Sequence, residues 1–158
     1  ATIGSQEKLS KARELGLDIG INYHEEDFSE VIKEMTMGQG VHVILDVVGA
    51  PYWEKNLNAL ATLGRMVLVG YLGGGRLETN IALLSPKRLK VQGTVLRARP
   101  IEEKIALTRQ IQQHVVPLLS DGTVKPVVDS VFPLSKCVEA HEYMESNANF
   151  GKIVLTID

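Results

Sequence analysis

The sequence lacks the residue types and patterns that several kinds of site require, so these sites are excluded. A single cysteine, Cys137, excludes an internal disulfide scaffold. The four histidines show no spacing typical of a metal site, such as H-E-x-x-H, so we predict no bound metal. With 17 basic and 19 acidic residues the formal charge is −2, which argues against nucleic acid as a partner. The longest apolar runs are far shorter than the roughly 20 residues that a membrane span needs.

The first 25 residues also lack the features of a targeting signal. They have neither a basic start nor an apolar core, so no signal peptide is visible and we expect a cytoplasmic protein. There is no initiator methionine, and the sequence opens inside an apolar stretch. We therefore expect a further segment upstream of Ala1.

Short apolar runs alternate with amphipathic segments along the chain. A helix that begins at Gln6, for example, places Leu9, Ala12 and Leu15 on one side. Strands that alternate with helices predict an α/β fold with a doubly wound parallel sheet, here one domain over residues 1–158. The strands are expected at 1–3, 18–23, 41–48, 65–70, 89–96, 127–132 and 151–157. The helices are expected at 6–15, 27–35, 51–61, 100–118 and 135–144, with a helical turn at 81–84.

Ligands bind to such sheets at the carboxyl ends of the strands. After the first strand come Ser5, which can cap the next helix, and Lys8 on that helix's first turn, where backbone amides attract anions. No acidic residue stands at the strand's tip to bind the ribose hydroxyls of NAD, so this end favours the 2′-phosphate of NADP. The alternative is that Ser5 is only a cap and Lys8 only a solvated surface lysine.

Glycines stand at two further strand ends. Gly49 follows one buried run, and Gly70 ends the next, ahead of three consecutive glycines at 73–75. A glycine lets a ligand approach the backbone closely, so these positions extend the predicted ligand site. The alternatives are a tight strand-to-helix turn at Gly49 and a flexible connector after Gly70.

Several short segments, in a fixed order, carry a resemblance to a known enzyme superfamily. They span essentially the whole chain: SQEKL (5–9), ARELG (12–16), INY (21–23), DVVG (46–49), GRMV (64–67) and GKIV (151–154). Together they resemble the medium-chain dehydrogenases/reductases. Two more specific pieces, YWEKN (52–56) and YME (143–145) ahead of Asn149, are similar to the zinc-free, NADPH-dependent quinone oxidoreductases. The resemblance implies a Rossmann-like cofactor domain that carries NADPH, with hydride transfer to a quinone or related electrophile.

The resemblance also implies where the cofactor would lie. Carried over by position, Ser5 and Lys8 hold the 2′-phosphate, for which Gly4 leaves room. The other implied contacts follow the dinucleotide along its length: Tyr23, Asn149 and Lys152 at the adenosine phosphate, Val48 and Gly49 at the ribose, Gly70, Tyr71 and Leu72 near the nicotinamide, and backbone groups of Thr94 and Leu96 near its amide. No residue stands out as a general acid or base, so the catalytic residues are unknown.

The sequence departs from that family in one respect. Complete members begin with a separate substrate-side, GroES-like domain, followed by the first Rossmann strand and a glycine-rich turn. Residues 1–158 contain neither that domain nor a G-x-G-x-x-G pattern. Because the first strand lies in the middle of a 3-2-1-4-5-6 sheet, its two neighbours would here lack a shared partner. We expect unpaired backbone groups that cost roughly 1–3 kcal/mol each, and NADPH binding by this chain that is weak or absent.

Two interpretations of the chain's role stay open. It is the cofactor-binding part of an enzyme, or it is a truncated, non-catalytic relative that acts as a binding or dimerisation module. Strand 89–96 would lie at a sheet edge, which invites pairing with a second copy, so we predict a homodimer of the complete protein. The adjacent basic cluster at 87–90, together with Arg97 and Arg99, predicts a solvated surface or, alternatively, an anion or RNA contact.

Overall fold

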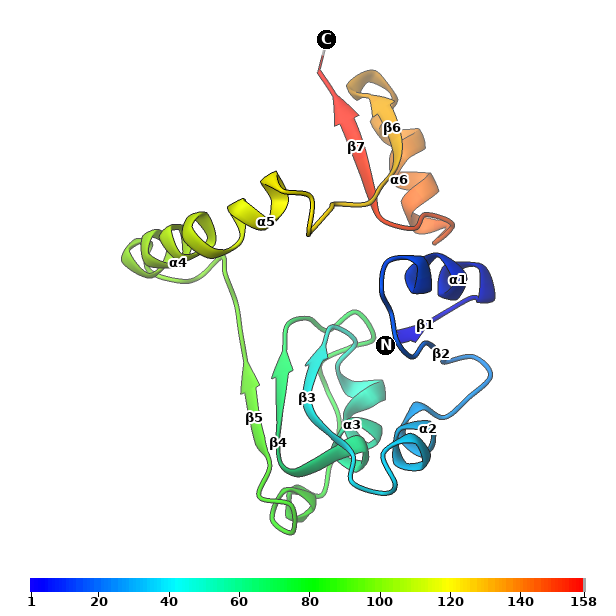
Figure 1. The fold of residues 1–158 in the computed structure, drawn as a ribbon, viewed down its shortest axis with the longest axis vertical. Coiled ribbons are helices and arrows are strands. Elements are labelled where there is room, and N and C mark those ends of the chain that lie inside the picture. The colour runs from blue at the N-terminus through cyan, green and yellow to red at the C-terminus, as the bar shows by residue number, and fades with distance from the viewer. Residues whose placement is uncertain (158) are drawn as a thin grey trace. The chain divides into compact units, whose positions relative to one another are not determined.

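The computed structural model describes residues 1–157, which form two compact units, one over residues 1–98 and the other over residues 99–157 (Figure 1). Each unit is an α/β arrangement in which every strand pair is parallel, as predicted. In the part of the chain that is described, every helix is too short or too polar to span a lipid bilayer.

The first unit contains two separate parallel sheets. One pairs β1 with β2, and the other has the order β3-β4-β5. Among residues 1–157 no strand joins β1 to β3, which confirms the prediction that two neighbours lack a shared partner. The predicted continuous sheet is therefore interrupted at this point.

The elements of the first unit are β1 (Thr2–Ile3), α1 (Gln6–Glu14), β2 (Ile21–Asn22), α2 (Phe28–Met35), β3 (Val41–Asp46), η1 (Ala50–Tyr52), α3 (Trp53–Ala59), β4 (Leu60–Leu68), η2 (Ile81–Leu84) and β5 (Lys90–Gly93).

Side-chain caps start the helices α1 and α2. Ser5 accepts a hydrogen bond from the backbone N–H of Lys8 at 3.2 Å and opens α1, and Asp27 accepts one from Ser29 at 2.9 Å and opens α2. Each cap satisfies a backbone donor that the first turn of a helix would otherwise leave unpaired. Both helix starts are therefore encoded locally, and both the Ser5 cap and a helix over 27–35 were predicted.

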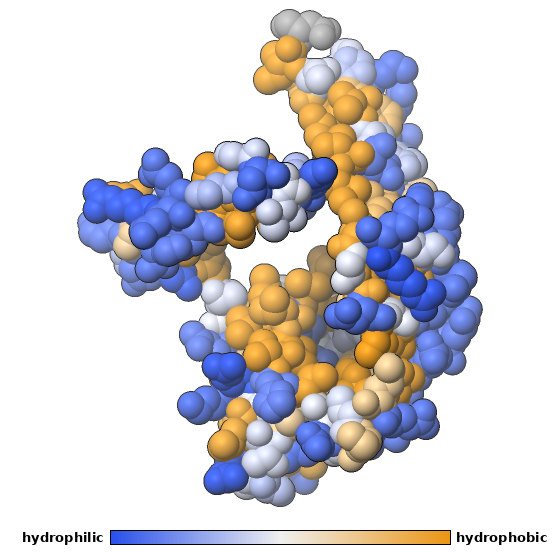
Figure 2. Space-filling model, in the orientation of Figure 1, coloured by the Kyte–Doolittle hydropathy of each residue, from blue (hydrophilic) through white to orange (hydrophobic). Residues whose placement is uncertain are grey.

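Within the first unit, helices α2 and α3 pack on one face of the β3-β4-β5 sheet, and no described element of this unit covers the opposite face. The core on the packed face consists of Ile21, Phe28 and Ala59 in one cluster and Leu57, Leu60 and Met66 in another. On β3, Val43 and Leu45 are 50% and 71% exposed. Figure 2 shows apolar side chains gathered over β3 and β4 in this view.

Two predicted boundaries in the first unit are wrong. Leu60 and Ala61 were expected on the helix over 51–61, but α3 ends at Ala59 and Leu60 is extended (φ −68°, ψ 138°) at the start of β4. Both residues are buried, and an apolar pattern that continues across a helix-to-strand change carries no mark of the boundary. The strand expected over 89–96 ends at Gly93, so Leu96 lies beyond it.

The second unit contains α4 (Ile101–His114), α5 (Val116–Ser120), β6 (Val128–Pro133), η3 (Leu134–Lys136), α6 (Cys137–Glu145) and β7 (Lys152–Thr156), with β6 parallel to β7. The single helix predicted over 100–118 breaks at Val115. Pro117 explains the break, because proline lacks a backbone N–H and its ring collides with the preceding turn. The helix expected over 135–144 starts later, because Ser135 lies inside η3 and α6 begins after it without a side-chain cap.

Candidate functional site

A buried carboxylate fixes the turn that follows β3. Asp46 is 3% exposed and accepts hydrogen bonds from the backbone N–H groups of Val48 (2.7 Å) and Gly49 (3.1 Å) and from Nδ2 of Asn56 (3.0 Å). Asn56 is buried as well and comes from α3, so the turn is anchored to the helix that follows it. Sequence analysis did not assign this role. An aspartate directly before a glycine-containing turn was the available signal, because its side chain caps the backbone two residues on.

The turn after β3 is joined to the glycine-rich loop after β4. Backbone hydrogen bonds run from Leu72 to Val47 (3.0 Å), from Gly73 to Val48 (2.8 Å) and from Ala50 to Gly74 (2.9 Å). The residues predicted at these two strand ends are thus brought together. They are Val48 and Gly49 on one loop and Gly70, Tyr71 and Leu72 on the other.

Gly49 is required where these two loops meet. Its φ of +88° is unfavourable for other residues, and a Cβ there would lie 2.6 Å from the carbonyl oxygen of Gly74. Beside it is a cavity of about 290 Å³, at the small end of the range for ligand pockets. Its lining comprises Gly49, Ala50, Trp53, Leu68, Tyr71, Gly75 and Leu77.

The ends of β1 and β2 bring together Gly4, Ser5, Lys8 and Tyr23. A Cβ on Gly4 would lie 2.5 Å from the hydroxyl oxygen of Tyr23, so glycine is needed here for the tyrosine ring to approach. The neighbouring carboxylate of Glu7 is held by Lys11, one turn further along α1, at 2.7 Å. That hydrogen bond lowers the pKa of the Glu7 carboxyl, which is therefore ionised near neutral pH. The carboxylate points along α1 toward Lys11.

Aromatic rings surround the tip of β2. The Tyr23 ring stacks at a tilt on His24 with centroids 4.4 Å apart, and it meets Tyr52 edge-on at 6.5 Å. Burial raises the pKa of the Tyr52 hydroxyl, and a hydrogen bond with the side chain of Thr2 opposes that shift. The hydroxyl is therefore protonated at neutral pH.

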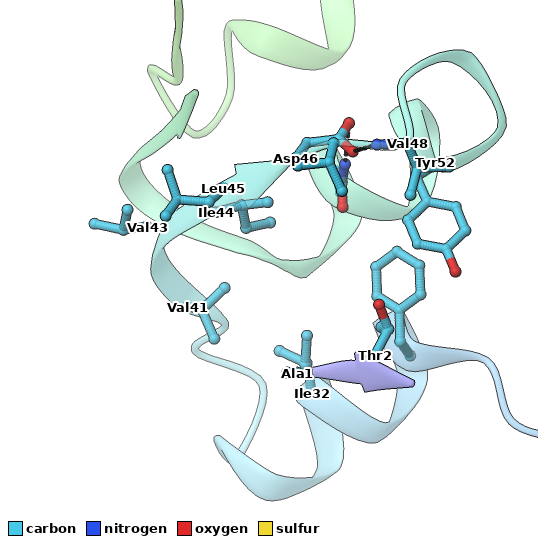
Figure 3. A pocket seen from close by; sticks show the side chains of 13 residues that line it. Ala1, Thr2, Ile32, Val41, Val43, Ile44, Leu45, Asp46, Val48 and Tyr52 are labelled. Carbon is cyan, nitrogen blue, oxygen red and sulfur yellow. Dashed lines mark hydrogen bonds between the residues drawn. The ribbon is translucent and has the colours of Figure 1, made fainter. Parts of the chain in front are cut away.

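A second cavity, of about 270 Å³, lies between the two sheets of the first unit (Figure 3). Ala1 and the first residue of β1, Thr2, form one side, and residues of β3 between Val41 and Asp46 form the other. Sequence analysis expected unpaired strands here but did not identify a cavity.

The remaining predicted residues, Thr94, Leu96, Asn149 and Lys152, do not belong to the two groups described above. Thr94 follows β5 and its backbone N–H donates to Leu68 of β4 at 3.0 Å, whereas Leu96 is exposed in the segment beyond. Asn149 and Lys152 belong to the second unit. Asn149 donates to the carbonyl of Gly151 at 3.0 Å, and Lys152 is the first residue of β7, so both stand at the amino end of a strand.

Lys87, at the start of the basic cluster, is not a solvated surface lysine. Its Nζ donates to the carbonyl oxygens of Leu57 (3.1 Å), Asn58 (2.8 Å) and Leu60 (2.6 Å) at the end of α3. Burial lowers the pKa of this amine. Lys87 closes the carboxyl end of the helix, where a cation is favoured by the helix dipole.

Comparison with known proteins identifies the family. A family model described as zinc-binding dehydrogenase matches residues 15–155. The chain belongs to the zinc-binding dehydrogenase family. It is 32% identical over 160 residues to quinone oxidoreductase 1 of Escherichia coli, covering 98% of this chain and 47% of that protein. The chain thus spans about half the length of the curated relatives it matches.

Solved structures support the same fold. The chain matches a crystal structure of an NAD-dependent alcohol dehydrogenase with a TM-score of 0.82 and 30% identity, over 100% of this chain and 43% of that one. It matches the Escherichia coli quinone oxidoreductase complexed with NADPH with a TM-score of 0.80 and 31% identity, over 98% and 48%. The architecture is therefore the Rossmann-like, mixed α/β cofactor-binding fold of the medium-chain dehydrogenases/reductases, as predicted.

The zinc in the family's description has no counterpart in the described residues. Within 1–157, no group of three or more His, Cys, Asp or Glu side chains is arranged to hold a metal ion. No step that uses zinc can be derived from these residues.

Proposed function

We propose that this chain is the cofactor-binding part of an oxidoreductase that transfers a hydride between NADPH and a quinone or related electrophile. The observation that carries the proposal is the group at the ends of β1 and β2. There the Ser5 hydroxyl, the first turn of α1 with Lys8, and the Tyr23 hydroxyl lie together, while Glu7 is drawn along the helix by Lys11.

This group has the chemistry that a 2′-phosphate requires. Backbone amides at a helix start and a lysine on the first turn both attract a dianion. In this proposal Ser5 and Lys8 bind the 2′-phosphate and Tyr23 lies beside the adenosine phosphate. Asn149 and Lys152 are proposed at that phosphate as well, on the family resemblance alone.

The joined loops after β3 and β4 suit the other half of the cofactor. The cavity beside Gly49 and Tyr71 has room for one planar ring, and Asp46 holds its wall in place before any ligand arrives. In this proposal Val48 and Gly49 line the ribose and Gly70 and Leu72 approach the nicotinamide. Backbone groups of Thr94 and Leu96 lie near its amide. When bound, NADPH supplies the hydride, and the chain orients the ring and limits access of water.

Two relatives point to different cofactors. The Escherichia coli quinone oxidoreductase was solved with NADPH, whereas another similar structure is an NAD-dependent enzyme. The acid-free tip of β1 favours NADPH for this chain.

A charge reversal at Lys8 tests this preference. Lys8→Glu, in a longer protein that carries this chain, should raise the KM for NADPH about tenfold, equivalent to about 1.4 kcal/mol, with little effect on the KM for NADH. Lys125→Glu, an exposed change in the second unit, is the control, and an unchanged KM in Lys8→Glu removes Lys8 from the site.

The 158-residue chain itself is expected to bind NADPH more weakly than micromolar. It has no G-x-G-x-x-G turn to cradle the pyrophosphate. Calorimetric titration with NADPH tests this, and micromolar or tighter binding would contradict it.

We propose also that the complete protein is a cytoplasmic homodimer paired through β5. This strand bonds only to β4 within its sheet, so its other edge is open among the described residues. Light scattering at tens of micromolar should give the mass of a dimer for the complete protein, and a monomer would contradict the proposal.

A further inference from the structure

One wall of the cavity beside Gly49 comes from the segment between β4 and η2. Residues 75–79, here called the strap, lead from the glycine-rich loop to the residue that caps η2. Gly75 and Leu77 of the strap line the cavity, whose other lining residues include members of η1, α3 and β4. The position of the strap therefore determines how much room the cavity has.

The strap is attached at both ends and at one point between them. Before it, the carbonyl of Gly74 accepts a hydrogen bond from the backbone N–H of Ala50 at 2.9 Å. After it, Asn80 caps η2 with its side chain. Between these ends, the described residues make a single hydrogen bond with the strap, from Nε1 of Trp53 to Oγ1 of Thr79 at 2.7 Å. The place of the strap beside the cavity therefore depends on this bond.

Trp53 is the fixed partner in this hydrogen bond. It is the first residue of α3, and its side chain packs against the core cluster of Leu57, Leu60 and Met66. Thr79 is half-buried, whereas the other residues of the strap are exposed. An indole N–H can only donate, and the threonine hydroxyl is its acceptor here. The bond thus ties an exposed segment to the core of the first unit.

We propose that Trp53 and Thr79 are positioning residues of the cofactor site, because their hydrogen bond holds the strap in place and so fits the cavity to one uncharged, planar ring. The cavity measures about 290 Å³, and within residues 1–157 no residue that lines it is charged. This inference rests on the proposed function, in which the ring is the reduced nicotinamide of NADPH. The reduced ring is uncharged, so it can enter a largely apolar cavity without the cost of burying a charge.

Loss of this bond should affect the rate of hydride transfer more than the affinity for NADPH. The phosphate contacts proposed for Ser5 and Lys8 follow a strand of the other sheet and do not involve the strap. Hydride transfer, in contrast, requires that the ring be held in one orientation, and small displacements of a reacting group are costly. A released strap would withdraw Leu77 from the cavity wall and leave the ring free to tilt.

Hydrogen exchange of one side chain tests the bond in the 158-residue chain. Trp53 is the one tryptophan, so its indole N–H gives a single NMR signal. Thr79→Val replaces the accepting hydroxyl with a methyl group and should speed exchange of this indole proton at least tenfold. Thr79→Ser keeps the hydroxyl, and Glu78→Gln changes an exposed neighbour, so both should exchange as the parent does. An exchange rate in Thr79→Val that equals the parent's would overturn the proposal.

The catalytic consequence is measured in a longer protein that carries this chain, with kcat expressed per NADPH-binding site so that unfolded protein does not lower it. Thr79→Val should lower kcat about fivefold and change the KM for NADPH less than twofold. Thr79→Ser should restore kcat. An unchanged kcat, or a loss that is confined to KM, would overturn the positioning role. A longer protein that binds no NADPH would contradict the proposed function and with it the identity of the ring, whereas the exchange measurement decides separately whether the bond holds the strap.

Discussion

The turn after β3 and the turn after β1 follow strands of two separate sheets in the first unit, and they are held in different ways. Asp46 is buried, and its carboxylate binds three donors that belong to the protein itself. Ser5 and Lys8 are only partly buried, and Tyr23 is 39% exposed. The turn after β3 therefore has a fixed shape, and it offers backbone groups to a ligand. The β1 turn presents side chains to its surroundings.

This difference separates the two tasks of a dinucleotide site. A rigid backbone turn allows close approach to a ring or sugar, because no side chain stands in the way. Charged and hydroxyl side chains discriminate between cofactors that differ by one phosphate. Changes at the β3 turn should therefore mainly affect stability, and changes at the β1 turn should mainly affect binding.

Removing the buried carboxylate should have the largest effect on stability. Asp46→Ala leaves two buried donors and one half-buried donor without their acceptor and should lower the free energy of unfolding by about 3 kcal/mol or more. Asn80→Ala is the matched control, since Asn80 accepts from the backbone N–H two residues on, at Ala82, but in an exposed turn. Its cost should be about 1 kcal/mol or less. Urea unfolding followed by the fluorescence of Trp53, the one tryptophan, reports on this unit, and equal costs would contradict the contrast.

Replacing glycine with alanine at two positions should have the next largest effect on the free energy of unfolding. Gly49→Ala combines a positive φ with a Cβ 2.6 Å from a backbone oxygen and should cost about 2–3 kcal/mol. Gly38→Ala has a similar φ of +79° but no atom within 4 Å of the added Cβ, so it should cost only about 1 kcal/mol. The same urea measurement compares them. If Gly38→Ala is as harmful as Gly49→Ala, the close packing of the two loops is not what requires glycine.

Lys87 should contribute less to the free energy of unfolding than Asp46 or Gly49. Lys87→Met keeps most of the side chain but withdraws the amine from three carbonyls at the end of α3, and should cost about 1 kcal/mol. Lys90→Met, at an exposed position of β5, should leave the urea midpoint unchanged. A midpoint for Lys87→Met that equals the parent's would show that solvent replaces these hydrogen bonds fully.

The smallest expected effect depends on pH. Hydrogen bonds from Ser29 first, and then Lys55, lower the pKa of Asp27 from 3.8 to about 2. Since the folded pKa is below the ordinary value, Asp27 stabilises the protein above pH 4 and loses that contribution as pH falls toward 2. The side chain is 41% exposed, so solvent screening keeps the effect small. The difference in urea midpoint between the parent and Asp27→Asn should shrink from pH 6 to pH 2.5, and a constant difference would contradict this.

The sequence predicted those features that local chemistry determines. The Ser5 cap, the helix expected over 27–35, the parallel pairing and the interruption between β1 and β3 are confirmed. The end of α3 was predicted wrongly, because Leu60 is buried in either conformation. The hydrogen bond between Asp46 and Asn56 and the Lys87 cap were missed for another reason. Both join residues ten to thirty positions apart, and only the fold brings such partners together.

Binding of a fragment that carries the 2′-phosphate tests the proposed cofactor site most directly. Isotope-labelled chain is titrated with adenosine 2′,5′-bisphosphate and, in parallel, with adenosine 5′-monophosphate, while NMR follows the backbone amides. The amides of Ser5, Lys8 and Tyr23 should shift with the bisphosphate, at least tenfold more tightly than with the monophosphate, and Lys8→Glu should remove the difference. Equal shifts with both nucleotides, or shifts that leave these three residues untouched, would contradict an NADPH site at the tip of β1.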